Sequence, residues 1–132
     1  MTPGLLPAWI GTRAYDADGA RLGHIADVLF DERTRRPDWL VVVLLRAEDR
    51  FVLVPAKGAR QHPRGIVLPV HRRIVRTAPT SAAPPDTLPF ADAQTLARHY
   101  GVACSAGPWM GIAEPELGRA EERVRMRVSR AA

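Results

Sequence analysis

Short runs of apolar residues recur along the first 77 positions, and polar turn residues separate them at intervals of about ten residues. Residues 9–15 form the first run, which predicts a strand ending at the Asp-Ala-Asp-Gly turn of residues 16–19. Aspartate favours such a turn because its carboxylate bonds nearby backbone amides, and glycine adopts a positive φ without strain. Residues 21–31 do not alternate cleanly, so a helix is an alternative there, but Gly23 and the flanking turns favour a bulged strand.

The most apolar run, residues 39–45, is rich in β-branched side chains and has no polar face. Such a run is typical of a central strand that is buried on both sides. Residues 51–54 predict the returning strand, which Pro55 ends because proline has no N–H to donate to a ladder. Residues 66–70 and 73–77 predict two further short strands. The expected fold class is therefore mainly β, a small antiparallel barrel of about five to six short strands.

The composition changes after residue 77 and divides the chain into three parts. Residues 1–77 hold the predicted barrel, residues 78–89 are Pro-rich and predict a linker, and residues 90–132 form an extension. Within the extension, residues 91–100 predict one short helix that ends at Gly101.

An Arg-rich tail completes the extension, and its residues 123–128 alternate arginine with valine or methionine. Alternation with a period of two is a strand pattern. We therefore expect this segment to add a strand to a sheet edge, its own or a partner's, with a frayed terminus as the alternative.

The first part of the chain carries a set of short motifs whose order is more specific than any one of them alone. In chain order they are Ile10-Gly11, Asp18-Gly19, Leu22-Gly23-His24-Ile25, Asp27-Val28, Asp31, Trp39-Leu40-Val41-Val42 and Val54-Pro55. This order resembles the PRC-barrel superfamily, which includes the cytoplasmic domain of the photosynthetic reaction-centre H subunit and the C-terminal domain of the ribosome maturation factor RimM.

The resemblance spans roughly residues 9–77 and implies a barrel too small for a cavity. It implies structural roles for seven residues: Gly11, Asp18, Gly19, Gly23, Asp27, Asp31 and Pro55. Gly11 and Gly23 would allow close backbone approach, and Asp27 and Asp31 would hold strand ends by accepting backbone amides. The resemblance also implies a module that docks other proteins, since the family has no shared catalytic constellation.

The residue types that carry out catalysis or bind metals show no usable spacing in this sequence. The four histidines, His24, His62, His71 and His99, lack the short ligand spacing of metal sites. Cys104 is the single cysteine, and a nucleophile needs a base within hydrogen-bond reach. No phosphate loop or nucleophile elbow is present. We therefore expect no catalytic residues, no metal, no cofactor and no enzyme activity.

The net charge is +5, and among the 19 basic residues Lys57 is the single lysine. This excess of arginine indicates codon bias as readily as selection for a polyanionic partner. The candidate interaction surface comprises one aromatic and four basic residues: Trp39, Arg60, Arg64, Arg72 and Arg73. Nucleic acid is a weaker alternative partner, because no aromatic platform for bases lies between Phe51 and Phe90.

The single cysteine allows no intramolecular disulfide, and no apolar run approaches the roughly 20 residues of a membrane-spanning helix. The first residues also lack the features of a signal peptide. We therefore expect a cytoplasmic protein with no integral membrane segment. Its expected function is that of a non-catalytic, protein-binding adaptor that docks a protein partner or a second copy of itself as a homodimer. The alternative is a ribosome- or RNA-associated factor that uses a basic surface.

Overall fold

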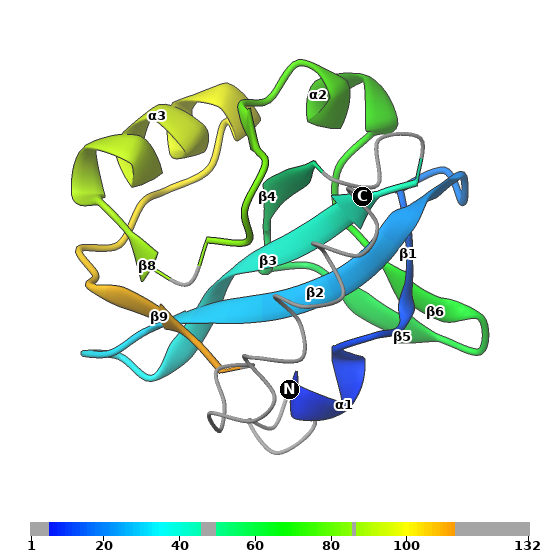
Figure 1. The fold of residues 1–132 in the computed structure, drawn as a ribbon, viewed down its shortest axis with the longest axis horizontal. Helices are drawn as coiled ribbons and strands as arrows, with labels where there is room; N and C mark the ends of the chain where they lie inside the picture. The colour runs from blue at the N-terminus through cyan, green and yellow to red at the C-terminus, as the bar shows by residue number, and fades with distance from the viewer. Residues whose placement is uncertain (1–5, 46–49, 86, 113–132) are drawn as a thin grey trace, which may run out of the picture.

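The computed structural model describes residues 6–45, 50–85 and 87–112 of the 132-residue chain. The strands are β1 (Arg13–Tyr15), β2 (Arg21–Asp31), β3 (Arg36–Leu44), β4 (Phe51–Pro55), β5 (Arg60–His62), β6 (Gly65–Val67), β7 (Thr80–Ser81), β8 (Thr87–Leu88) and β9 (Trp109–Gly111). The helices are α1 (Leu6–Trp9), α2 (Arg72–Arg76) and α3 (Phe90–Tyr100). The expected fold class, mainly β with one short C-terminal helix, is confirmed (Figure 1).

The strands pair in the order β5-β6-β1-β2-β3-β4-β7, while β9 joins both β2 and β8. Two strands pair with the same edge of β2. Strand β1 pairs with its first residues, and β9 pairs with its last residues. Strand β3 runs along its other edge. Within the described part, this path ends at β5 and β7 and does not close. The nine strands exceed the five to six expected, because strands of two or three residues leave no apolar pattern.

The segment whose apolar residues do not alternate cleanly, β2, is a bulged strand. Its register against β3 shifts between Ile25 and Asp27 and again between Leu29 and Phe30. A Cβ at Gly23 would overlap the backbone carbonyl oxygen of Val43, so only glycine fits this close approach of β2 to β3. The strand interpretation of residues 21–31 is therefore confirmed, and the helix alternative is wrong.

The three central strands β2, β3 and β4 bury both of their faces. Leu40 and Val42 of β3 pack on one face, and Trp39, Val41 and Val43 pack on the other. All five are at most 8% exposed, which confirms that the apolar run beginning at residue 39 is a doubly buried strand. Because each large apolar side chain contributes about 1.5–3 kcal/mol when fully buried, both faces are important for stability.

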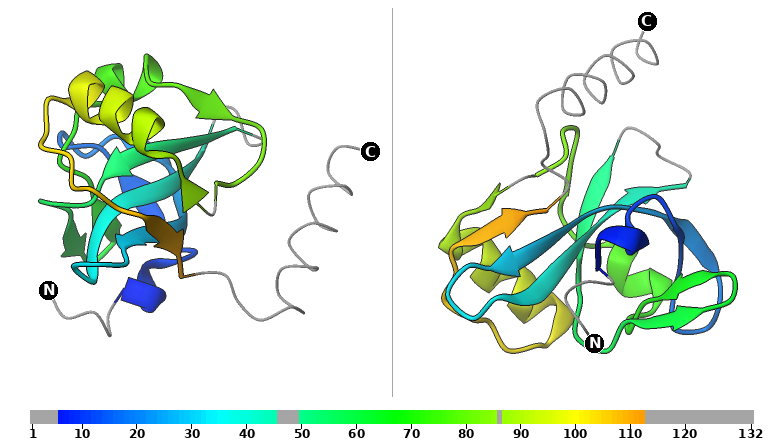
Figure 2. Two further views of the ribbon diagram at one scale, coloured as in Figure 1. Left: turned by 90° about the vertical axis from the view of Figure 1, so that its left-hand side faces the viewer. Right: turned by 90° about the horizontal axis from the view of Figure 1, so that it is seen from below.

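Two clusters result, one on each face. The barrel core comprises Trp9, Ala14, Leu22, Ile25, Val28, Leu40, Val42, Val52, Val54, Ala56, Ala59, Ile66, Leu68, Val70, Val75 and Ala78. The outer core comprises Leu29, Trp39, Val41, Val43, Phe51, Leu53, Leu88, Ala93, Leu96, Ala97 and Trp109. Helix α1, β1, β6 and α2 therefore cover the first face, and β8, α3 and β9 cover the second. The left view of Figure 2 shows α1 and α3 on opposite sides of the central strands.

Helix α2 replaces the strand that was expected over residues 73–77, so that prediction is wrong. Ile74 and Val75 are β-branched, which favours a strand, but only Val75 is buried. Side chains from outside the helix accept its first amides: His71 Nδ1 accepts from Arg73 N, and Asp16 Oδ2 accepts from Arg72 N at 3.0 Å. These contacts stabilise a helical turn where β-propensity alone favours a strand.

The Pro-rich segment predicted as a linker is hydrogen bonded to the sheet at two places. Strand β7 pairs with Phe51 and Val52 of β4, and β8 pairs with Trp109 and Met110 of β9. The predicted helix is present as α3, and Gly101 ends it with a φ of 71°, as expected. Apolar residues therefore continue to contribute to the core well beyond residue 77.

Some predictions fall on parts of the chain outside the described residues. One of them is the strand expected at residues 123–128. Among the described residues, no helix is long and apolar enough to cross a membrane.

Candidate docking groove

The predicted interaction residue Trp39 is not at the surface. It is 3% exposed and lies in the outer core, where its ring is 6.4 Å from the ring of Tyr100. Helix α3 covers the face that would otherwise present it. The prediction of a surface contact through Trp39 is therefore wrong, because the sequence pattern does not show what covers a strand.

The four predicted arginines are all exposed, but they lie in two places. Arg60 belongs to β5, Arg64 to the turn that follows it, and Arg72 and Arg73 begin α2. Figure 1 shows the β5–β6 hairpin at the lower right and α2 at the top, well apart. The basic residues therefore form two separate pairs.

Asp27 and Asp31 accept backbone amides, the role that their motifs suggested. Asp31 Oδ1 accepts from Arg33 N at 2.7 Å and from Thr34 N at 3.1 Å, and its Oδ2 accepts from Gly107 N at 3.0 Å. Burial alone would raise the pKa of the Asp31 carboxyl, but hydrogen bonds from Ser105 and these amides hold the pKa below its usual value. Asp31 therefore links the end of β2 to the loop before β9.

Asp27 makes a second link to the C-terminal segment. Its Oδ1 accepts from Val28 N at 2.7 Å and from Ile112 N at 3.0 Å. A Cβ at Gly111 would overlap the Asp27 carboxylate, so a larger residue at this position would have to displace that buried side chain. No sequence motif marks Gly111, and only its pairing with β2 shows its role.

Asp16, Asp18 and His71 bring their ligand atoms within 4.8 Å of one another, which is the spacing of a possible metal site. Asp16 Oδ1, however, accepts from Asp18 N at 2.9 Å and from Ala20 N at 2.8 Å, while His71 Nε2 lies 2.8 Å from Asp18 Oδ2. Burial acts to raise the pKa of Asp16, and the amide hydrogen bonds together with His71 outweigh it and lower the pKa. The cluster is explained as a turn and helix cap without a metal.

A polar network lies beside Cys104, where Ser105 joins two aspartates. The Ser105 hydroxyl is 2.7 Å from Asp31 Oδ2 and 2.6 Å from Asp38 Oδ2, and Trp109 Nε1 donates to Asp38 Oδ2 at 2.7 Å. Burial, together with the nearby Asp38 carboxylate, raises the pKa of the Cys104 thiol. A thiol held in its protonated form is a poor nucleophile.

His99, the histidine nearest to Cys104 in sequence, is engaged elsewhere. Its Nε2 lies 2.8 Å from Ile74 O and 3.2 Å from Thr77 Oγ1. These contacts link α3 to the end of α2. His99 therefore does not act as a base for Cys104 in this arrangement.

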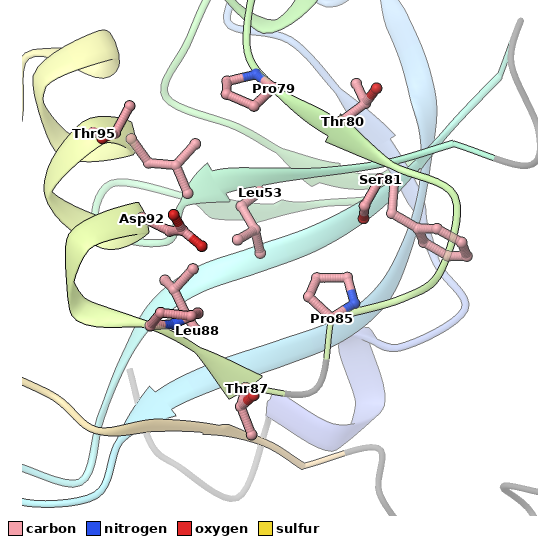
Figure 3. Close-up of a pocket in the computed structure, with 12 residues that line it drawn as sticks. Leu53, Pro79, Thr80, Ser81, Pro85, Thr87, Leu88, Asp92 and Thr95 are labelled. Carbon is pink, nitrogen blue, oxygen red and sulfur yellow. The ribbon is translucent and has the colours of Figure 1, made fainter.

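An open groove of about 380 Å³ lies between α3 and β7 (Figure 3). Leu53 of β4 lies at its base, and Asp92 of α3 points into it. The groove is called the docking groove below. It is lined by Phe51, Leu53, Pro79, Thr80, Ser81, Pro85, Thr87, Leu88, Pro89, Asp92, Thr95 and Leu96.

Two short strands border the docking groove, and each has one paired edge in the described part of the chain. Strand β7 pairs with β4 and ends the sheet, and β8 pairs with β9 alone. A strand edge without a neighbour presents backbone N–H and C=O groups that can pair with another chain. The groove therefore combines an apolar base, a helix on one side and a strand edge on the other.

Sheet topology and cores together define a small barrel-type β domain with a covered outer face. A family model described as PRC-barrel domain matches residues 6–75, which is more than half of the chain. The chain belongs to the PRC-barrel domain family. A search of the curated proteins found no match.

The family match covers only part of the docking groove. Phe51 and Leu53 lie inside the matched segment, whereas the residues of β7, β8 and α3 come after its end at residue 75. The family domain therefore contributes the base of the groove, and the following segment contributes its walls. The groove could not be predicted from the sequence, because a Pro-rich segment such as the one that forms its wall is typical of a linker.

Proposed function

We propose that this protein is a non-catalytic, protein-binding adaptor that holds an extended segment of a partner in the docking groove. The observation that carries this proposal is an open apolar groove bordered by a helix and by a strand with one unpaired edge. A peptide can add to such an edge as a further strand, so that backbone bonds give affinity and alternate side chains enter the groove.

The chemistry of the described ionisable groups supports a non-catalytic role. The buried aspartates accept backbone amides, and the Cys104 thiol has a raised pKa. The buried aspartates therefore stabilise the fold, and neither they nor Cys104 line the docking groove. We further propose a cytoplasmic location, because the single cysteine offers no intramolecular disulfide.

The test is selection of displayed random 12-residue peptides on the full-length chain. It is run on the wild type and on the variant V124D/M126D/V128D. In this variant the apolar residues of the strand-like tail segment are replaced, so that the tail does not compete with peptides for the groove. We expect enriched peptides with alternating apolar residues in at least one form. Thr95→Arg places a long side chain in the groove and should abolish their binding.

Gln61→Arg is the matched control, since it adds the same charge at an exposed position on β5, away from the groove. It should leave peptide binding unchanged. The proposal is overturned if neither form enriches any peptide, or if the selected peptides bind the Thr95→Arg and Gln61→Arg variants equally well. Selected peptides that match a segment of this chain would identify a second copy as the partner.

A second candidate function is a ribosome- or RNA-associated factor. The observation that favours it is the exposure of Arg60, Arg64, Arg72 and Arg73, none of which forms an ion pair within the described residues. Binding to RNA should weaken steeply as salt is raised, because the contacts would be with phosphates. Comparing R60E/R64E with R72E/R73E would show which pair is used, and salt-independent binding would exclude this function.

A further inference from the structure

The docking groove has a counterpart within this chain. We infer that residues 123–128 bind in the docking groove of their own chain and compete there with the partner, an inference that rests on the proposed function of the groove. The segment alternates Arg123, Arg125 and Arg127 with Val124, Met126 and Val128.

The apolar side chains of residues 123–128 match the apolar base of the groove. In an extended strand, Val124, Met126 and Val128 point to one side, because successive side chains alternate. The groove presents Leu53 and Leu96 to such a row of side chains. A strand that pairs with the edge of β7 therefore places its apolar side against the base of the groove.

The charge of the groove is opposite to the charge of residues 123–128. Asp92 is the single charged residue that lines the groove, it is exposed, and it forms no ion pair within the described residues. It points into the groove in Figure 3. An arginine-rich strand supplies the opposite charge at this position, with long side chains that reach the rim.

The chain between β9 and residues 123–128 is long enough to bring that segment to the groove. Strand β9 ends at Gly111 and pairs with β8, which lines the groove, so the tail starts beside the site it would fill. Residues 113–122 lie between Ile112 and the segment. Ten extended residues span up to roughly 33 Å, which is about the full width of a compact domain of this size, and the tail starts beside the groove, so it has a shorter distance to cover. An intramolecular contact of this kind has an effective concentration of about 1 mM, so even a weak strand competes.

The experiment uses the full chain with Cys104→Ser and Ser129→Cys, and a nitroxide on the new cysteine broadens nearby amide signals in NMR spectra. We expect broadening of Thr80, Ser81, Thr95 and Leu96, which line the groove, and no broadening of Gln61 in β5. Replacing Val124, Met126 and Val128 with Asp should remove the broadening.

The matched control is A113D/G118D/A120D, which adds the same three charges to the tail outside the alternating segment and should preserve the broadening. Broadening elsewhere on the domain, or none at all, would overturn the inference. A mixture of isotope-labelled chains without the nitroxide and nitroxide-labelled chains without the isotope distinguishes contact between two chains from contact within one chain. Groove broadening in that mixture alone would also overturn the inference and would identify a second copy as the occupant.

A second readout separates this inference from the proposed function. The affinity of a selected peptide should rise roughly tenfold in V124D/M126D/V128D and stay unchanged in the control. If peptides bind the groove but the tail variant has no effect, the adaptor function stands and the tail inference is wrong. If the groove signals broaden but no peptide is selected, the tail binds the groove, and both the adaptor function and the competition with a partner are wrong.

Discussion

The barrel core and the outer core lie on opposite faces of the same three strands, yet different parts of the chain cover them. Residues within the family match, such as Trp9 and Ile66, cover the barrel face. Residues beyond it, such as Leu96 and Trp109, cover the outer face. The family domain of this protein therefore has two apolar faces, and the C-terminal segment of the same chain covers the second.

The largest expected effect comes from removing one buried leucine from each face. Leu40→Ala in the barrel core and Leu29→Ala in the outer core should each lower the free energy of unfolding by about 2–5 kcal/mol. Both leucines are fully buried, so similar costs are expected if the two cores unfold together. Urea denaturation measures both values. A cost below about 1 kcal/mol for Leu29→Ala alone would show that the outer core opens separately.

The next effect concerns the carboxylate that links the two parts of the chain. Asp31→Asn places an amide where four hydrogen-bond donors converge, and we expect a loss of about 2–3 kcal/mol. Asp18→Asn is the control, because Asp18 has an exposed side chain and should change stability little. Equal stability of the two variants would contradict the linking role of Asp31.

The same carboxylates predict how stability depends on pH. Because the pKa values of Asp16 and Asp31 are lowered in the folded protein, their stabilising contribution is present above the unfolded value of 3.8. It is lost as the pH falls through the lower, folded-state pKa. Thermal unfolding between pH 5 and pH 2 should therefore show a falling melting temperature, with a shallower slope in Asp31→Asn. An unchanged slope in that variant would count against the lowered pKa.

Two of the three buried tryptophans, Trp9 of the barrel core and Trp109 of the outer core, give a smaller and more specific contrast. Trp109 Nε1 donates to Asp38 Oδ2, whereas Trp9 Nε1 is buried and finds no partner among the described residues. Trp109→Phe should therefore destabilise the protein by about 1 kcal/mol more than Trp9→Phe, since it alone removes a hydrogen bond. Denaturation curves of both variants provide the measurement, and the reverse order would show that the hydrogen bond contributes nothing net.

The smallest effect tests how α3 is fixed over the outer core. Tyr100 donates its hydroxyl to the backbone oxygen of Leu53 at 2.6 Å, on the strand that forms the base of the docking groove. Tyr100→Phe should lower the free energy of unfolding by about 0.5–1.5 kcal/mol. Faster hydrogen exchange of the α3 amides would accompany this loss. Unchanged exchange in α3 would indicate that apolar packing alone holds the helix.

The strands that could be predicted from sequence are those whose apolar pattern reflects their own burial. The run beginning at Trp39 has no polar face because both cores use it, and this pattern is visible without a structure. Helix α2 was missed because its first amides bond to His71 and to Asp16, the latter 56 residues away. Contacts of that range leave no local pattern.

The candidate site was harder to predict than the fold. The docking groove joins residues around position 53, the Pro-rich segment and α3, none of which indicates a site alone. Trp39 was expected at the surface because the sequence does not show that α3 covers it. The four arginines are exposed, but their separation into two pairs depends on where α2 and the β5–β6 hairpin lie.

The two-part cover of the central sheet also has a consequence for synthesis. The chain is made from its N-terminus, so the family-matched segment is complete at residue 75, whereas Trp109 follows 34 residues later (109 − 75). At about 5–20 residues per second, that interval lasts roughly 2–7 s. Until α3 and β9 have been made, the outer-core residues Trp39, Val41 and Phe51 lack the cover that these elements give them in the folded domain.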